Sequence, residues 1–570
     1  MKRDDNITKN IFSDINFDNY IIQYEGDIIQ EVSKEPNYYV LLINDKYAII
    51  SVPKNVEPFD IAAKFSSVVY VKPAEMYTLE EISPLEASQA NFLQLELPLN
   101  LTGKGVNIGI IDTGIDYLCE EFMDSNGQTR IEYIWDQTIN SNNVDDSIPF
   151  GSVYTKAQID EAIKAYKEGK SPYEIVPSKD EIGHGTNMSG IIGSTGKNPN
   201  LKGVVPECNF VVVKLIQDDS FKKQFNVDIP VYNITSIFAA IEFLYRYSLR
   251  IAKPIVMYLP LGSSLGSHTG NDILGKYLES ISSNSGIAIV TGTGNERNKR
   301  GHASGIIPVA GGLNVMEIDV DPTQKNLWLE VWVPSPNVMS IDIISPSGEN
   351  SGVMNALINS TELYTFIFEK TSIKVNYYLP EEFTGDELIR IRFYNIQAGI
   401  WKIRLIGNYV LDGKFDAWLP QDGIKHRNTG FGGSDPYNTI TNPGNSEYLL
   451  TAAAYNQNNN NIVNYSGMAP IDDFVGKIDV AAGGVNALTV APNNNVATVN
   501  GTSVSAAILA GASAMLLEWG IVNGNYPYMY SQGMKAFIAR GTLKRMGDIY
   551  PNQQWGYGIL NILTMFQNMT

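Results

Sequence analysis

The sequence of 570 residues carries a formal net charge of −19, with 44% hydrophobic and 18% charged residues. That length exceeds what one hydrophobic core usually supports, so we expect a soluble protein of two or three domains. Binding to nucleic-acid phosphates requires clustered lysine and arginine, so the acidic balance argues against a nucleic-acid partner.

Residues 1–79 predict a small α+β domain of their own. Strand-like runs cover residues 38–43, 47–52 and 68–71, and a short helix is expected over 58–65. The charged N-terminus has no apolar segment behind it, and no run of eighteen apolar residues occurs in the chain. We therefore expect cytoplasmic synthesis without a signal peptide, and no membrane span.

An aspartate follows the first strand of what reads as an α/β domain. Residues 106–111 form an apolar run typical of a buried parallel strand, and Asp112, Thr113 and Gly114 follow it directly. Open α/β sheets carry their functional groups at the carboxyl edge of the strands, where this carboxylate would lie. On its own the motif more often marks only a turn.

A histidine flanked by glycines comes next, after an insertion at residues 140–182 that contains a surface helix over 155–169. The small residues that follow His184, up to Gly193, predict a helix that packs closely on its neighbours, with the imidazole in its first turn. A histidine between glycines is more often a loop residue than a base, so this motif alone is also weak evidence for catalysis.

Asn295 supplies a side-chain amide within a glycine-rich segment between this histidine and the candidate nucleophile. An acyl-transfer enzyme can use such a donor to hold an oxyanion. Ser503 follows Gly501 and Thr502, and residues 504–519 are rich in alanine and leucine without proline, so the serine is expected to open a long buried helix. The helix N-terminus adds a favourable dipole and free N–H groups for a developing negative charge.

Asp112, His184 and Ser503 together supply an acid, a base and a nucleophile. A serine hydroxyl attacks only when a neighbouring imidazole takes its proton, and that imidazole needs a carboxylate to fix its tautomer. Each motif is weak by itself, but four such signals, each on the type of element that its role requires, are not expected to coincide by chance. The combination predicts a serine endopeptidase that works by acyl transfer.

The order Asp, His, Asn and Ser, with these flanking residues, resembles the subtilisin-like serine proteases of the S8 subtilase family over residues 80–315 and 430–565. The resemblance implies an α/β fold with a parallel-sheet, three-layer core. It also makes Asn295 the oxyanion side chain, helped by the backbone N–H of Ser503.

The same resemblance identifies a substrate cleft and a cleavage site. The resemblance implies that the strand over residues 256–262 and the glycine-rich segment before Asn295 border the cleft. Residues 83–89 resemble the start of a mature subtilisin, which places autoprocessing at Leu79 and Glu80, with the cut after Leu79. The expected cleft residues are Leu259, Pro260, Leu261, Gly262, Gly292 and Gly294.

Between residues 315 and 428 the sequence changes to short alternating strands separated by proline, glycine and asparagine. We predict an inserted β-sandwich with jelly-roll topology, similar to accessory domains of some subtilases, whose role is stabilisation or substrate docking. Its expected strands include residues 327–333, 340–344, 388–393, 401–406 and 415–419.

The whole layout resembles the Csp germination proteases of clostridial spores. That family implies a protease packaged in the spore that activates a cortex-hydrolase precursor by cleaving it, with its own propeptide as a cleft ligand. General intracellular subtilases share the layout, so that alternative stays open. The predicted segments are 1–79 (propeptide and intramolecular chaperone), 80–314 (first part of the core), 315–428 (β-sandwich) and 429–570 (second part of the core, with the nucleophile).

Two positions depart from the subtilase pattern. Asn187 stands where a second histidine is usual, and Ala507 where a proline is usual, but neither supplies a proton or a nucleophile.

The predicted chemistry requires no cofactor. Calcium sites are common in subtilases, yet no ligand cluster stands out here, and Cys119 and Cys208 lack metal-ligand spacing.

Three other classes of protein are alternatives. A catalytically silent pseudoprotease, acting in signalling or binding, would keep the same fold, although an intact set of catalytic residues argues against it. An aspartic protease needs two facing carboxylates, whereas the Asp112 motif occurs once. An adhesive β-rich protein would explain residues 315–428 and nothing else.

Overall fold

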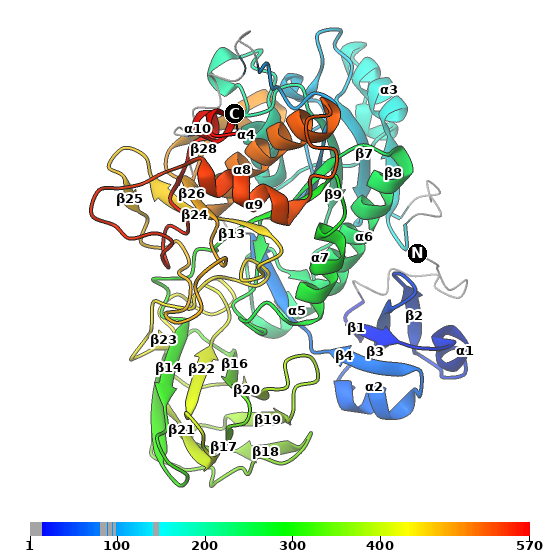
Figure 1. Ribbon diagram of the computed structural model, residues 1–570. Coiled ribbons are helices and arrows are strands. Elements are labelled where there is room, and N and C mark those ends of the chain that lie inside the picture. Colours follow the sequence, from blue (N-terminus) through cyan, green and yellow to red (C-terminus); the bar gives the residue numbers. More distant parts are fainter. Residues whose placement is uncertain (1–13, 80–87, 89–93, 95–98, 141–147, 570) are drawn as a thin grey trace.

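The computed structural model describes residues 14–79, 88, 94, 99–140 and 148–569. Figure 1 shows a large α/β core with two smaller units beside it. We call residues 14–79 the N-terminal unit and residues 302–431 the two-sheet unit.

The core is built on one mixed sheet whose central strands are parallel. β6 (Asn107–Asp112) lies between β11 (Ile255–Tyr258) and β9 (Asn209–Lys214), and every residue of β6 and β11 is buried. Burial on both faces explains why these strands read as continuous apolar runs. The other strands are β29 (Thr542–Leu543), β30 (Ile559–Leu560), β26 (Val480–Gly483), β24 (Leu450–Asn456) and β13 (Ile287–Gly292) on the β11 side, β7 (Ile131–Asp136) and β8 (Ser152–Thr155) on the β9 side, and β25 (Asn461–Ile462), which pairs with β24.

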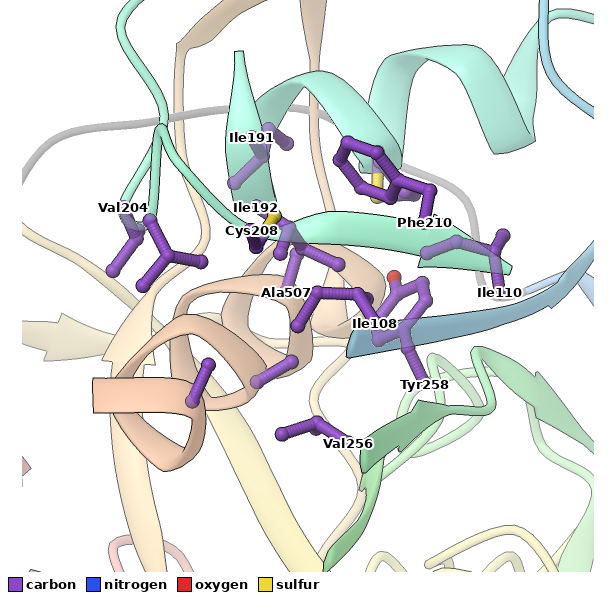
Figure 2. Packing of buried hydrophobic residues seen from close by; sticks show 14 of the residues in the cluster. Ile108, Ile110, Ile191, Ile192, Val204, Cys208, Phe210, Val256, Tyr258 and Ala507 are labelled. Atoms are coloured by element: carbon purple, nitrogen blue, oxygen red, sulfur yellow. The ribbon is translucent and has the colours of Figure 1, made fainter. Parts of the chain in front are cut away.

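Helices cover both faces of this sheet, so the core has three layers. On one face, α4 (His184–Gly193) and α8 (Thr502–Leu517) share an apolar cluster with the strands. Figure 2 shows part of this cluster, to which Ile108 of β6, Ile191 of α4 and Ala507 of α8 all belong. The opposite face carries α6 (Ile234–Ile251) and α7 (Ile273–Ser282), and the remaining helices of the core are α3 (Lys156–Lys167), α5 (Asp219–Phe225), α9 (Ser531–Arg540) and α10 (Ile562–Gln567).

α8 is the central helix of the core. All of its residues are buried, and the π-helical turn Glu518–Val522 extends it. The stretch Thr502–Val522 is long and apolar enough to cross a membrane, but 89% of its most apolar window is buried inside the protein. A helix that is apolar all round is what a core position requires, so packing accounts for its composition.

The N-terminal unit is a four-stranded antiparallel sheet with its own apolar core and two short helices. β1 (Phe17–Tyr24) pairs with β3 (Tyr47–Pro53) on one side and with β4 (Val68–Lys72) on the other, and β2 (Tyr39–Leu42) lies at the edge. The helices are α1 (Ile28–Val32) and α2 (Pro58–Lys64), and the latter occupies the segment predicted to be helical.

The two-sheet unit packs a six-stranded and a four-stranded antiparallel sheet over a shared apolar core that contains Trp401. Its strands begin with β14 (His302–Ile306), ahead of residue 315. The six-stranded sheet runs β14, β22 (Lys414–Trp418), β16 (Asn326–Val333), β20 (Glu387–Tyr394), β19 (Ser372–Tyr378) and β18 (Thr361–Thr365), and the four-stranded sheet runs β17 (Val338–Ile344), β21 (Gly399–Tyr409), β15 (Leu313–Val320) and β23 (Gly430–Phe431).

A buried carboxyl should make the stability of this unit depend on pH. Oε2 of Glu387 accepts the backbone N–H of Met339 at 2.7 Å, and burial raises the pKa of Glu387 to about 8. The folded unit thus holds a proton that the unfolded chain releases above the ordinary pKa of 4.5. Stability should therefore fall as the pH rises from that value to about 8.

Glu387→Gln keeps the acceptor oxygen but cannot ionise, so it should raise the unfolding temperature by roughly 2–4 °C at pH 8. At a pH below 4.5, where both states carry the proton, we expect no gain. Scanning fluorimetry of both proteins at the two pH values measures this. An equal gain at both would show that ionisation of Glu387 is not the cause.

Candidate active site

The aspartate and the histidine predicted from the sequence are in direct contact. Asp112 is the last residue of β6 and His184 is the first of α4, and the exposed fractions of these residues are 0% and 4%. His184 Nδ1 lies 2.9 and 2.8 Å from the two carboxylate oxygens of Asp112. A hydrogen bond from Nδ1–H to a carboxylate leaves the lone pair on Nε2, which is the tautomer that a general base requires.

A second buried carboxylate, on Asp180, ties the loop after β6 to the start of α4. Its Oδ1 accepts the hydroxyl of Thr113 at 2.7 Å and the N–H of Gly183 at 2.8 Å. Its Oδ2 accepts both the N–H (2.8 Å) and the hydroxyl (2.7 Å) of Thr186. Four hydrogen bonds thus fix the two segments that carry Asp112 and His184. Asp180 is not among the residues predicted from the sequence, where its only signal is an acidic residue four positions before the histidine.

Glycine is required at the contact between these segments. A Cβ on Gly185 would lie 2.1 Å from the carbonyl oxygen of Gly114 and 3.2 Å from Cβ of Asp112. The first turn of α4 therefore approaches the aspartate more closely than any other residue would allow.

Ser503 lies at the opening of α8, as predicted. It is the second residue of the helix, it is 1% exposed, and Gly501 precedes the helix with φ +135°. The hydroxyl of Tyr258, at the carboxyl end of β11, donates to the carbonyl oxygen of Ser503 at 2.8 Å. The serine thus lies at the same carboxyl edge of the sheet as Asp112, and α8 packs directly against α4.

Asn295 contacts the residue that precedes the serine. Its Oδ1 accepts the backbone N–H and the hydroxyl of Thr502, both at 3.3 Å. Because Thr502 holds the amide oxygen, the Nδ2 group with its two hydrogens is the part of Asn295 that can serve a ligand. This orientation suits an oxyanion donor next to Ser503.

The tail of the N-terminal unit forms a strand within the expected substrate cleft. β5 (Met76–Leu79) is antiparallel to β12 (Leu261–Gly262) on one side, with Leu79 opposite Leu261 and Thr78 opposite Gly262. On the other side it is antiparallel to β10 (Tyr232–Asn233). An extended peptide between two strand edges is a common mode of peptide recognition. Glu80 lies outside the described residues.

The other expected cleft residues lie at or beside the carboxyl ends of β11 and β13. Leu259 and Pro260 link β11 to β12 and are buried, and Gly292 ends β13. Gly294 has φ +80°, and the side chain of Thr441 lies where its Cβ would be. A cavity of about 810 Å³ adjoins these groups, and its lining includes Gly262, Asn295, Glu296, Gln421 and Thr441.

The two departures from the family pattern have local packing roles. The carbonyl oxygen of Asn187, in α4, accepts the hydroxyl of Thr489 at 2.7 Å. Thr489 belongs to β27 (Ala487–Ala491), which pairs with β28 (Asn495–Val499) in a hairpin that packs on α4. Ala507 is a buried residue within the continuous helix α8.

Comparisons with known proteins identify the family of the chain. The model of the Subtilase family, Peptidase_S8, matches residues 103–318 and 426–558, which is more than half of the chain. The solved structure of the Clostridium perfringens CspB protease matches with a TM-score of 0.74 and 29% identity, covering 84% of this chain and 99% of that one. No curated protein sequence matches. The family match places the chain in the subtilase family of serine peptidases.

Proposed function

We propose that the chain is an autoprocessing serine endopeptidase whose catalytic residues are Asp112, His184 and Ser503. The observation that carries this proposal is the buried hydrogen bond of His184 to Asp112 at the sheet edge where α8 begins with Ser503. His184 takes the Ser503 proton as the oxygen attacks a peptide carbonyl, and the bond that forms is an acyl ester. The reaction uses protein groups and water alone.

Asn295 stabilises the tetrahedral intermediate in this proposal. Its Nδ2–H and the backbone N–H of Ser503 bind the oxyanion, and His184 then gives its proton to the leaving amine. Water, activated by the same imidazole, hydrolyses the acyl ester and regenerates the serine. Asp112 stays ionised and stabilises the imidazolium that forms in each step.

Residues 1–79 act as the propeptide, and the cut falls after Leu79, before Glu80. Support comes from β5, which reaches the cleft from the N-terminal unit and ends at Leu79 opposite Leu261 of β12. The fully buried side chain of Tyr77 lies in the apolar cluster of the core, as an anchoring substrate side chain would. The two-sheet unit is the inserted jelly roll.

The propeptide stays bound after cleavage, because its contacts extend well beyond β5. Nζ of Lys72, a buried lysine in β4, lies 2.9 Å from the Asp272 carboxylate of the core. Glu57, at the start of α2, accepts Lys374 at 2.5 Å and Arg392 at 3.2 Å from the two-sheet unit. These groups are mostly shielded from water, so the ion pairs are stronger than those on a surface.

Glu57→Gln should weaken this retention without blocking cleavage, because it removes the charge that faces Lys374 and Arg392. We expect the cleaved propeptide to dissociate about tenfold faster, and size-exclusion chromatography followed over time measures the free fragment. Glu25, which is exposed, offers a matched control as Glu25→Gln. Equal dissociation of the two variants would show that the Glu57 cluster does not hold the propeptide.

The substrate that we propose is the precursor of a spore cortex hydrolase, activated by cleavage during germination, and the protease is packaged in the spore. Similarity to the CspB protease supports this assignment over that of a general intracellular subtilase. The test is to incubate the purified full chain, and its Ser503→Ala variant, with a clostridial cortex-hydrolase precursor. A single new cut by the active chain alone is expected, and an intact precursor would contradict this substrate.

A further inference from the structure

The main-chain ladder between β5 and β12 is short. It pairs Leu79 with Leu261 and Thr78 with Gly262, and β12 ends at Gly262. Met76 lies two residues further back along β5 and pairs only on its other side, with Asn233 of β10. A buried carbonyl needs a hydrogen-bond donor, so the strand that lies in the cleft requires another partner at Met76.

Gln421 supplies that donor. Its Nε2 lies 3.0 Å from the carbonyl oxygen of Met76 and 2.9 Å from the carbonyl oxygen of Gly262. Its Oε1 accepts the backbone N–H of Ser264 at 3.4 Å, and the residue is only 2% exposed. One side chain thus bridges the edge of the cleft and the peptide that occupies it.

Gln421 comes from the linking segment, residues 419–429, which joins β22 to β23 of the two-sheet unit and is attached to the core. The N–H of Leu419 donates to the carbonyl of Gly301 at 2.8 Å. The N–H of Asp422 donates to Glu296 Oε2 at 3.0 Å, and the Asp422 carboxylate in turn accepts Lys299 at 3.0 Å. Glu296 follows the oxyanion residue Asn295 directly, so the linking segment contacts both the peptide in the cleft, at Met76, and the residue next to Asn295.

We infer that Gln421 is a substrate-binding residue, through which the linking segment of the inserted unit extends the protease cleft to the main chain three residues before Leu79. This inference rests on the proposed function. It predicts that the substrates are extended polypeptides whose main chain reaches at least to the position of Met76. A shorter peptide would offer no carbonyl to Gln421. Because Gln421 contacts the main chain, it favours longer substrates but does not select the side chain at this position.

The contact can be tested without catalysis in the full-length Ser503→Ala chain. Gln421→Met keeps the length of the side chain but offers no donor, and Gln421→Glu places an acceptor against two carbonyl oxygens. We expect amide hydrogen exchange over residues 74–79 to accelerate about tenfold in the first variant and further in the second. Gln324→Ala is the matched control, because the buried Gln324 also bridges backbone groups, through Asn326 and His426, without touching β5.

Unchanged exchange over residues 74–79 in both Gln421 variants would overturn the inference. So would faster exchange throughout β20 and β21, since Gln421 would then act on the fold of the two-sheet unit. With Ser503 restored, Gln421→Met should accumulate about tenfold more uncut chain than the Gln324→Ala control at equal times. If the wild-type chain is never cut, the proposed function fails, while the exchange result still decides whether Gln421 holds the strand.

Discussion

Asp112→Asn should slow the self-cleavage of the chain about 10⁴-fold while leaving its fold intact. The carboxylate accepts Nδ1–H of His184 with both oxygens, and it thereby keeps the lone pair on Nε2. An amide of the same shape can donate to Nδ1 instead, which would leave the proton on Nε2, where it blocks the removal of the serine proton. The rate is measured as the loss of uncut chain in a time course of intact masses.

The matched control is Asp116→Asn, in the same loop. One Asp116 oxygen accepts the N–H of Asn493 at 2.7 Å, and the other accepts the N–H of Leu118 at 3.1 Å. We expect this control to cut itself within about threefold of the wild-type rate. Cleavage of Asp112→Asn at the control rate would show that the Asp112–His184 contact has no part in the reaction.

Asn295→Ala should slow the same reaction by about 10²–10³-fold, the loss known for removing one oxyanion donor from a subtilisin. Thr502 binds Oδ1 of Asn295 and so turns the Nδ2 hydrogens toward the substrate side, where they can bind the oxyanion. The donor contributes only when negative charge develops, so the fall should appear in the cleavage rate rather than in the binding of β5. Intact-mass time courses measure the rate, and hydrogen exchange over β5 measures the binding.

Asn298→Ala is the control for this prediction, since Asn298 is an exposed residue of the same loop. A loss of activity in Asn295→Ala that is accompanied by faster exchange of β5 would contradict an oxyanion role. It would indicate instead that Asn295 shapes the cleft through Thr502.

The sequence predicted the strand and the two helices that carry Asp112, His184 and Ser503 because each motif is a local pattern. An apolar run before Asp112 indicates a buried strand, small residues after His184 indicate a close-packed helix, and alanine-rich residues after Ser503 indicate a buried helix. The structure confirms each of these elements. The parallel sheet then brings their ends to one edge, which follows from the topology of such folds.

Other features depend on contacts between distant parts of the chain. Asp180 lies in a loop, and its role emerges only where four donors from two segments converge on it. β1 was not among the predicted strands, because four consecutive buried residues replace the alternation that marks a half-buried strand. Gln421 reaches Met76 across 345 positions of sequence, and a lone glutamine after a strand carries no recognisable pattern.

The central claim, that Ser503 cuts its own chain, is tested most directly by the intact masses of the purified full-length protein and of its Ser503→Ala variant. We expect two species from the wild type, residues 1–79 and residues 80–570, and a single uncut chain from Ser503→Ala. Two uncut and folded proteins would contradict it and would instead support a catalytically silent pseudoprotease whose cleft binds β5 permanently.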